Sequence, residues 1–436
     1  MLAIVLVLEL QISRPSILRS YSSSSALLEI MTQTSTTPIP AGTRPVQQAC
    51  PSCGHGELHV FYEVRNVPVH SCLMMGSEEE AVNFPTGDVV LGFCPHCGFI
   101  TNVAYDAKHA DYSPIYEDQQ SFSPTFNSFA GRLAQRLIDK YNLNDKHIVE
   151  IGCSKGDFLL MMCELSNSSG VGIDPSAIVG RVQSAAVSRV KFIQEYYSEK
   201  HSDQVGEFIC CRHTLEHIHQ TEELVQTVRK SIGDRLDTIV FFEIPDMGRV
   251  LRDQAFEDIY YEHCSYFTPG TLARLFRKAG FEVIDLYLDY GDQYLMIEAK
   301  PVAGISDKIH PAEESVEAVA QDVERFATQI GPKLEHWKTH LETMKAEGKR
   351  VAVWGSGSKC VAFLTTLNTK ELVECIVDIN PHRQGRFIPG VGKQIQSPEF
   401  LKEYQPDEVI VMNAIYCDEI QTMLDGMGVK TTVVAI

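Results

Sequence analysis

The pattern of hydrophobic and polar positions predicts strands and helices that follow one another in the order strand, helix, strand along much of the chain. This order is typical of parallel sheets. Continuous apolar runs at 147–152 and 170–175 flank a helical run at 156–165. Short apolar runs of this kind are typical of strands buried on both faces. Further strand-like runs lie at 190–197, 206–211 and 238–246, and further helical runs lie at 126–141, 221–232 and 268–280. The helical run at 126–141 has Ser123 or Thr125 as its predicted N-cap.

The last two strand-like runs of this region, 281–290 and 293–301, are separated by only Gly291 and Asp292. Such a short connection predicts a β-hairpin at the edge of an otherwise parallel sheet. The sequence therefore predicts an α/β fold with a central seven-stranded Rossmann-like sheet. A second strand–helix–strand pattern starts at 350 and continues to 436, which predicts a C-terminal Rossmann-like α/β domain. Between the two, 311–347 is predicted to form two helices divided at Gly331-Pro332.

Composition narrows the class of protein. Among 436 residues, 44% are hydrophobic and 22% charged, as in ordinary globular proteins. The net charge of −19 repels phosphate backbones and anionic lipid, so we expect no nucleic-acid or membrane partner, and a monomer or small homo-oligomer. Residues 1–11 are apolar but too short to span a bilayer. The basic residues Arg14 and Arg19 are a feature of mitochondrial presequences, but such presequences are poor in acids, and Glu9 and Glu29 are acidic. A cytoplasmic location is therefore predicted, and organelle targeting stays an alternative.

Thirteen cysteines without a dense disulfide pattern suit a reducing compartment. Four of them form two C-P-x-C-G pairs, with ligands predicted at Cys50, Cys53, Cys94 and Cys97. Each C-x-x-C turn directs two thiolates at one ion, and two such turns complete a tetrahedral site. We expect one structural Zn²⁺, because four sulfur ligands leave no open position for water. The forty residues between the pairs predict an inserted sub-sheet, and His55 and His96 are expected to be bystanders.

The turn after the strand at 147–152 reads EIGCSKGDF, and Asp174 lies at the tip of the next strand. Glycines let the chain turn sharply beside a ligand, and an acid at this position accepts hydrogen bonds from ribose hydroxyls. Both NAD and S-adenosylmethionine enzymes use this arrangement. The G-x-x-x-G spacing lacks the middle glycine that pyrophosphate requires, and the edge hairpin is unusual for dinucleotide folds, so S-adenosylmethionine is favoured. The predicted cofactor residues are Glu150, Gly152, Gly156, Asp157, Asp174 and His213.

Four motifs together resemble the three-domain S-adenosylmethionine-dependent C-methyltransferases that act on nucleotide-linked ketosugars. They are the paired C-x-x-C-G turns, VEIGCSKGDFL with GVGIDPS, YYEHCSYFTPGTLARLFRKAGFEV, and VWGSGSK with IVDINPHRQGRFIPG. The match covers residues 49–436. It departs from the family at Ser154, where the family has glycine, and between the cysteine pairs.

The resemblance implies a catalytic set of His263, Glu262, Tyr260, His217 and Tyr116. His263 is expected to remove a proton from the acceptor carbon, since histidine titrates near neutrality. Glu262 would orient the imidazole or raise its basicity, and Tyr260 would donate to the developing enolate oxygen. His217 would line the acceptor pocket, and Tyr116 matches the family's loop tyrosine better than Tyr112 does. The alternative is that His263 and Tyr266 only pin a loop to the core and that the loop tyrosine is a packed rim residue.

His213 and His217 are spaced i, i+4, but no third ligand is evident in the sequence, so a second metal ion is not expected. Gly355–Lys359 is either a phosphate loop or a simple turn. Alternative functions are an O- or N-methyltransferase acting on another small molecule, and a zinc-stabilised binding protein with a vestigial site. The predicted parts are 1–48 (disordered extension and linker), 49–107 (zinc-binding), 108–302 (methyltransferase), 303–348 (helical connector) and 349–436 (C-terminal Rossmann-like).

Overall fold

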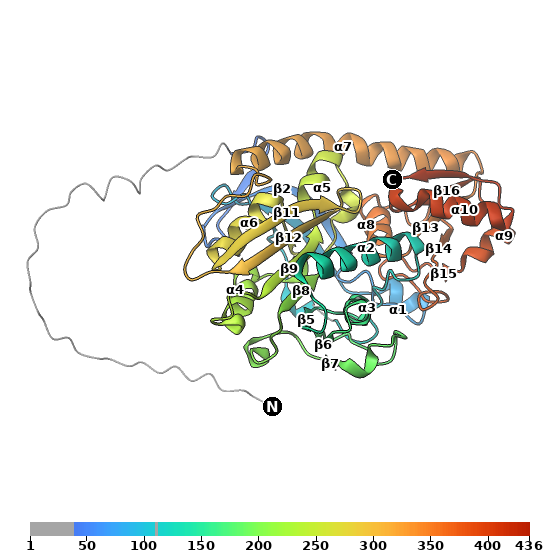
Figure 1. The fold of residues 1–436 in the computed structure, drawn as a ribbon. Helices are drawn as coiled ribbons and strands as arrows, with labels where there is room; N and C mark the ends of the chain where they lie inside the picture. Colours follow the sequence, from blue (N-terminus) through green and yellow to red (C-terminus); the bar gives the residue numbers. More distant parts are fainter. Residues whose placement is uncertain (1–38, 110–111) are drawn as a thin grey trace, which may run out of the picture. The chain divides into compact units, whose positions relative to one another are not determined.

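The computed structural model describes residues 39–109 and 112–436, so the predicted targeting segment lies outside the described residues. Its central sheet contains seven strands in the order β11-β12-β9-β8-β5-β6-β7 (Figure 1). β12 runs antiparallel to both β11 and β9, which confirms the predicted edge hairpin. The strands are β5 (His147–Ile151), β6 (Ser169–Ile173), β7 (Val190–Ile193), β8 (Phe208–Arg212), β9 (Ile239–Pro245), β11 (Phe281–Asp289) and β12 (Tyr294–Pro301).

Helices cover both faces of the central sheet because successive strand residues point to opposite sides. Phe241 lies in one hydrophobic core with α2 (Pro124–Tyr141) and α3 (Asp157–Leu165). Phe242, the next residue, lies in another with α4 (Thr221–Ile232) and α6 (Pro269–Lys278). Ser123 is the N-cap of α2, since its hydroxyl accepts from the backbone N–H of Phe126 at 3.2 Å.

An N-terminal antiparallel sheet has the order β1-β2-β3-β4-β10. Its strands are β1 (Arg44–Val46), β2 (Leu58–Pro68), β3 (Thr86–Phe93), β4 (Ile100–Asn102) and β10 (Ser265–Tyr266), with helix α1 (Glu78–Val82) between β2 and β3. The segment predicted as extension and linker, 1–48, therefore contains a strand, β1, near its end. Three residues carry no readable apolar period, and β1 forms because β2 offers its edge for backbone hydrogen bonds. β10 comes from the chain segment between β9 and α6, so the central part of the chain contributes one strand to the N-terminal sheet.

The C-terminal sheet is parallel throughout, in the order β15-β14-β13-β16-β17. This confirms the predicted second Rossmann-like unit. Its strands are β13 (Val351–Trp354), β14 (Cys375–Val377), β15 (Ile395–Gln396), β16 (Glu408–Val411) and β17 (Thr432–Ala435). Its helices are α8 (Ser358–Thr366), α9 (Leu401–Tyr404) and α10 (Cys417–Met427).

One long helix, α7 (Val316–Ala346), takes the place of the two helices predicted around Gly331-Pro332. Proline removes one backbone donor, but the buried face of the helix continues past it, and this packing outweighs the lost hydrogen bond. Phe326 meets the ring of Tyr62 at 5.4 Å, and Trp337 meets Phe363 of α8 at 5.5 Å. α7 thus joins the N-terminal and C-terminal sheets in one core (Figure 1).

Shorter elements complete the fold. Helix α5 (Met247–Asp253) follows β9 and is capped by Asp246. Single 3₁₀ turns lie at Ala107–His109, Val187–Arg189, Glu199–His201, Leu215–His217, Phe256–Asp258, Pro398–Phe400 and Ala414–Tyr416. In the part of the chain that the structure describes, none of the helices combines the length and apolar composition needed to cross a membrane.

Candidate active site and cysteine cluster

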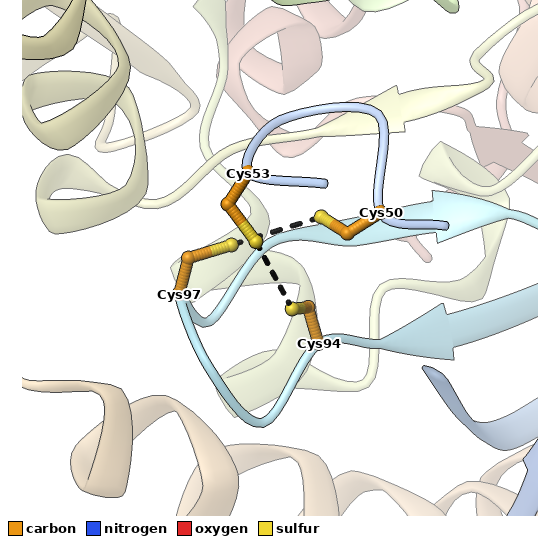
Figure 2. Close-up of side chains that lie close together, drawn as sticks. All are labelled: Cys50, Cys53, Cys94 and Cys97. Atoms are coloured by element: carbon orange, nitrogen blue, oxygen red, sulfur yellow. Dashed lines mark hydrogen bonds between the residues drawn. The ribbon is translucent and has the colours of Figure 1, made fainter. Parts of the chain in front are cut away.

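The four predicted cysteine ligands meet between two tight turns, one before β2 and one between β3 and β4 (Figure 2). The Sγ atoms of Cys50 and Cys97 are 3.7 Å apart, and those of Cys53 and Cys94 are also 3.7 Å apart. Four sulfur atoms at about 2.3 Å from one tetrahedral ion would be separated by about 3.8 Å. The donor set and its spacing therefore fit a closed tetrahedral metal site.

A cavity of about 500 Å³ lies where the carboxyl ends of the central strands face those of the C-terminal sheet. Ligands of open α/β sheets bind at such ends, where the strand order reverses. That reversal falls between β5 and β8 in the central sheet and between β13 and β16 in the C-terminal sheet. Every predicted catalytic and cofactor residue lines this cavity except Gly156 and Glu262.

The loop after β5 packs closely against neighbouring side chains. Gly152 has φ +70°, and a Cβ there would lie 1.8 Å from Oγ1 of Thr214. Gly156 has φ +88°, and a Cβ there would meet the Phe192 ring at 2.5 Å. Ser154 also takes a left-handed conformation, φ +47°, which explains physically why glycine suits that position in the resembled family. Glycine at these two positions therefore lets the loop pack closely against Thr214 and Phe192.

Asp174 follows β6 and fixes this loop. One of its carboxylate oxygens accepts from the backbone N–H of Ser154 at 2.9 Å, and the other from Ser176 at 2.6 Å. The hydroxyl of Ser154 donates to Asp118 at 2.6 Å. Asp157, the first residue of α3, accepts from the Gln119 amide at 2.9 Å. Two acidic side chains from separate loops therefore border the space in front of Gly152.

Buried charges alternate in sign beneath the cavity. Arg212 donates two hydrogen bonds to Glu243, at 2.9 and 2.8 Å, and His213 Nε2 lies 2.7 Å from the same carboxylate. Burial works against a charge on His213, but Glu216 and Glu243 outweigh it and raise its pKa to about 9. Burial raises the pKa of Glu150 to about 8, and its Oε2 atom has no hydrogen-bond partner among the described residues. Glu150 thus brings one buried oxygen atom without a partner to the cavity wall.

The predicted base His263 lies in the turn before β10, 4% exposed. Its Nε2 is 2.7 Å from the hydroxyl of Tyr260, and its ring meets that of His217 at 4.8 Å. Burial lowers the pKa of His263 well below 6.5, helped by His217, His213 and Lys359. Burial also raises the pKa of Tyr260 well above 10. At neutral pH the pair is a neutral imidazole beside a protonated phenol.

Glu262 does not contact His263, so the prediction that it orients this imidazole is wrong. Its carboxylate accepts from the backbone N–H of Ser71 at 2.9 Å and from the Ser71 hydroxyl, and it lies 3.1 Å from Nδ1 of His70. Neighbouring residues of the turn point in different directions, which sends Glu262 towards the segment after β2 and His263 towards the cavity. Glu262 still touches the site through its carbonyl oxygen, 3.1 Å from Nδ1 of His217.

Both loop tyrosines line the cavity, Tyr116 buried and Tyr112 half-buried. Tyr116 stacks edge-on against Tyr112 at 5.1 Å. The hydroxyl of Tyr112 lies 2.9 Å from Nδ1 of His217. The structure therefore gives Tyr112, the less favoured of the two in the sequence, the direct contact with a predicted site histidine.

The C-terminal loop Gly355–Lys359 repeats the geometry of the first loop. The N–H of Gly355 donates to Val377 at 2.9 Å, and the N–H and hydroxyl of Ser356 donate to Asp378 at 2.9 and 2.6 Å. Lys359 is held by Asp258, and Arg383 lies 3.9 Å from Asp378. Two cationic side chains thus border the cavity at this end.

Sequence reasoning did not single out several residues of the site. Asp378 could have been found, because it follows the second strand of its unit as Asp174 does. Glu243 could also have been found, since a charge inside a buried strand needs a partner. Glu216, Arg383 and Asp118 gave no signal, because only the fold brings them to the cavity.

Comparison with known proteins agrees with this geometry. A model described as "Methyltransferase domain" matches residues 125–286, and one described as "C-methyltransferase C-terminal domain" matches residues 300–433. The C-methyltransferase NovU of Streptomyces niveus is 27% identical over 408 residues, which cover 86% of this chain and 92% of that protein.

Solved structures match a smaller share of the chain. The riboflavin-derivative dimethyltransferase RosA of Streptomyces davawensis has 16% identity and a TM-score of 0.33 over 41% of this chain, and the match spans 56% of RosA. The PH0226 protein of Pyrococcus horikoshii has 16% identity and a TM-score of 0.34 over 41% of this chain and 92% of its own.

The protein is therefore a methyltransferase that uses S-adenosylmethionine. More narrowly, it is a C-methyltransferase in which an N-terminal four-cysteine sheet, a methyltransferase domain and a C-methyltransferase C-terminal domain follow one another.

Proposed function

We propose that this enzyme methylates a carbon of a nucleotide-linked ketosugar and that His263 removes the proton from that carbon. The observation that carries the proposal is the pair of half-buried Tyr260 and buried His263 on the wall of the cavity. Methylation at carbon needs a nucleophile made by deprotonation, and therefore a neutral base and a donor for the enolate oxygen. A hydroxyl acceptor also needs a base, but only a carbon acceptor needs a donor for an enolate oxygen.

S-adenosylmethionine supplies the methyl group. Glu150, Gly152, Gly156, Asp157, Asp174 and His213 would hold it, with Asp174 accepting from the ribose hydroxyls. Gly156 would act indirectly, by keeping the entry to α3 close to the loop. The orphaned Oε2 of Glu150 supports this placement, as does the fact that all of these residues except Gly156 line the cavity.

The chemical step follows from the chain's own groups. While the protonated Tyr260 donates to Nε2 of His263, that nitrogen carries the lone pair a base needs. As the acceptor enters, the Tyr260 hydroxyl would turn to the ketone oxygen, and Nε2 would take the proton from the neighbouring carbon. Tyr260 then stabilises the enolate oxygen, and the low pKa of His263 favours later release of the proton.

The cavity's second end supports a nucleotide-linked acceptor. Lys359, Arg383 and the backbone turn at Gly355 border it, and cations beside a glycine loop suit phosphate. The sugar would then extend from this end towards His263, with His217 and Tyr116 on its sides.

The proposal is tested with tritiated S-adenosylmethionine, a nucleotide-ketosugar pool and the variant His263→Gln. We expect at least about 100-fold slower labelling, with a matching loss of exchange of the acceptor's α-carbon proton with deuterated water. His219→Gln is the matched control, because His219 is a partly buried histidine of the same region that does not line the cavity. Wild-type turnover in His263→Gln would refute the proposal. So would a product whose label sits in a chemically cleavable ether bond.

We also propose that the cysteine cluster holds one structural Zn²⁺. Four thiolates close the site to water, so the ion would tie the two turns together and take no part in chemistry. Metal analysis of the purified protein should find about one zinc per chain on these ligands, and Cys50→Ser with Cys53→Ser should lose it. Unchanged zinc content in that double variant would contradict the assignment.

A further inference from the structure

A second group of metal-ligand side chains lies in the cavity wall, away from the cysteines. Glu216 and His217 belong to the 3₁₀ turn after β8, and His263 comes from the turn before β10. One ligand atom of each lies within 4.8 Å of the others. In the sequence, the i, i+4 spacing of His213 and His217 made these two histidines the candidate pair of metal ligands. The fold instead turns His213 towards Glu243 and brings in His263.

The carboxylate of Glu216 has His213 as a charged neighbour but makes no hydrogen bond among the described residues. The residue is 2% exposed, and neither of its carboxylate oxygens has a hydrogen-bond partner among the described residues. Its ion-pair partner there is His213, whose Nδ1 is 3.5 Å from Oε1. A buried carboxylate without hydrogen bonds is costly unless a cation lies against it.

The two histidines already have the outer contacts that metal ligands usually have. A ligating histidine donates its second ring N–H to a carbonyl, carboxylate or similar acceptor, which fixes its tautomer. Nδ1 of His217 is 3.1 Å from the carbonyl oxygen of Glu262, and Nε2 of His263 is 2.7 Å from the Tyr260 hydroxyl. Nε2 of His217 and Nδ1 of His263 have no hydrogen-bond partner within the described part of the chain. Each ring can therefore present one nitrogen to an ion.

We propose that Glu216, His217 and His263 bind one divalent transition-metal ion, separate from the cysteine site. Two imidazoles and one carboxylate suit Zn²⁺, Fe²⁺ or Co²⁺. Two ligands at about 2.1 Å from one ion can be at most about 4.2 Å apart, so small side-chain movements close the present spacing. Three protein ligands leave coordination positions open towards the cavity.

An ion in this site would hold His263 in the tautomer opposite to the one a base needs. Metal binding and proton removal by His263 would then exclude one another. The binding claim itself does not depend on the proposed reaction, because it rests on the ligand geometry and on the unpartnered carboxylate.

The test is a Co²⁺ titration of the full-length protein with its cysteine site loaded with zinc. We expect about one further Co²⁺ per chain, with weak visible bands and without the strong ultraviolet absorption of thiolate ligation. Glu216→Gln should weaken this binding at least about tenfold, since even outer contacts of metal ligands contribute that much. His263→Gln, as a second variant, should do the same, and His219→Gln should bind as the wild type does.

Two results would overturn the proposal. One is the absence of Co²⁺ binding beyond the cysteine site, which would mean that His213 alone balances the charge of Glu216. The other is equal Co²⁺ affinity in the wild type, Glu216→Gln and His263→Gln. Neither result depends on methyl transfer, so failure here is distinguishable from failure of the proposed reaction.

Discussion

Gly152→Ala tests whether the loop after β5 holds the cofactor. The backbone at Gly152 has φ +70°, where alanine is strained by about 1 kcal/mol after allowing for its stiffer unfolded chain. The added Cβ would also lie 1.8 Å from Oγ1 of Thr214 and 2.7 Å from its Cβ, so the loop after β8 must move. Overpacking of this kind costs about 1–3 kcal/mol. The free energy of unfolding should therefore fall by about 2–4 kcal/mol.

Gly180→Ala separates strain from collision. Gly180 has φ +81°, but a Cβ there would meet nothing within 4 Å, so only the backbone strain of about 1 kcal/mol applies. Urea unfolding measures both variants, and calorimetric titration with S-adenosylhomocysteine measures the cofactor site. We expect affinity at least about tenfold weaker in Gly152→Ala and unchanged in Gly180→Ala. A folded Gly152→Ala that binds with wild-type affinity would show that the loop is only a tight turn.

Three further changes probe the same loop. Asp174→Ala should weaken S-adenosylhomocysteine binding about tenfold or more, because hydrogen bonds to a charged group contribute about 1.5–3 kcal/mol; unchanged affinity by calorimetry would contradict this. Ser154→Gly should be more stable to urea than Ser154→Ala by about 1 kcal/mol, since both lose the contact with Asp118 and only alanine keeps the strain at φ +47°. Glu150 has a pKa of about 8 in the folded state against 4.5 as its ordinary value, so the folded state binds the extra proton between these values. The stability of the wild type relative to Glu150→Gln should therefore fall as pH rises from 5 to 8 and level off above; a constant difference would exclude the raised pKa.

The sheets were predictable because buried strands and covering helices leave long apolar periods. The edge hairpin also followed from its short turn at Gly291 and Asp292. β1 was missed because three exposed-edge residues carry no period, and the prediction at Pro332 failed because a local helix breaker was weighed without the packing of Phe326 and Trp337. In both cases tertiary contacts overrode a local signal.

The residues of the candidate site also fall into two groups, those that a local sequence pattern predicts and those that only tertiary contacts bring together. Residues that follow a strand directly, such as Gly152 and Asp174, were readable because sheet geometry places strand ends together. Glu216 could not be predicted as a site residue, because its possible partner His263 lies on a turn 47 positions later in the chain. The orientation of Glu262 was misread because adjacency in sequence does not imply that two side chains face the same way.

The repeated loops explain why the two Rossmann-like units share one cavity. In each unit a glycine N–H donates back to the end of the second strand, and an aspartate just beyond that end fixes the loop, as Asp174 and Asp378 do. Each loop therefore borders the cavity at the carboxyl end of its first strand. Because the two sets of strand ends face one another, the two loops border the same space. A single large site results, with His263 on its wall, whereas either unit alone would offer only one end of it.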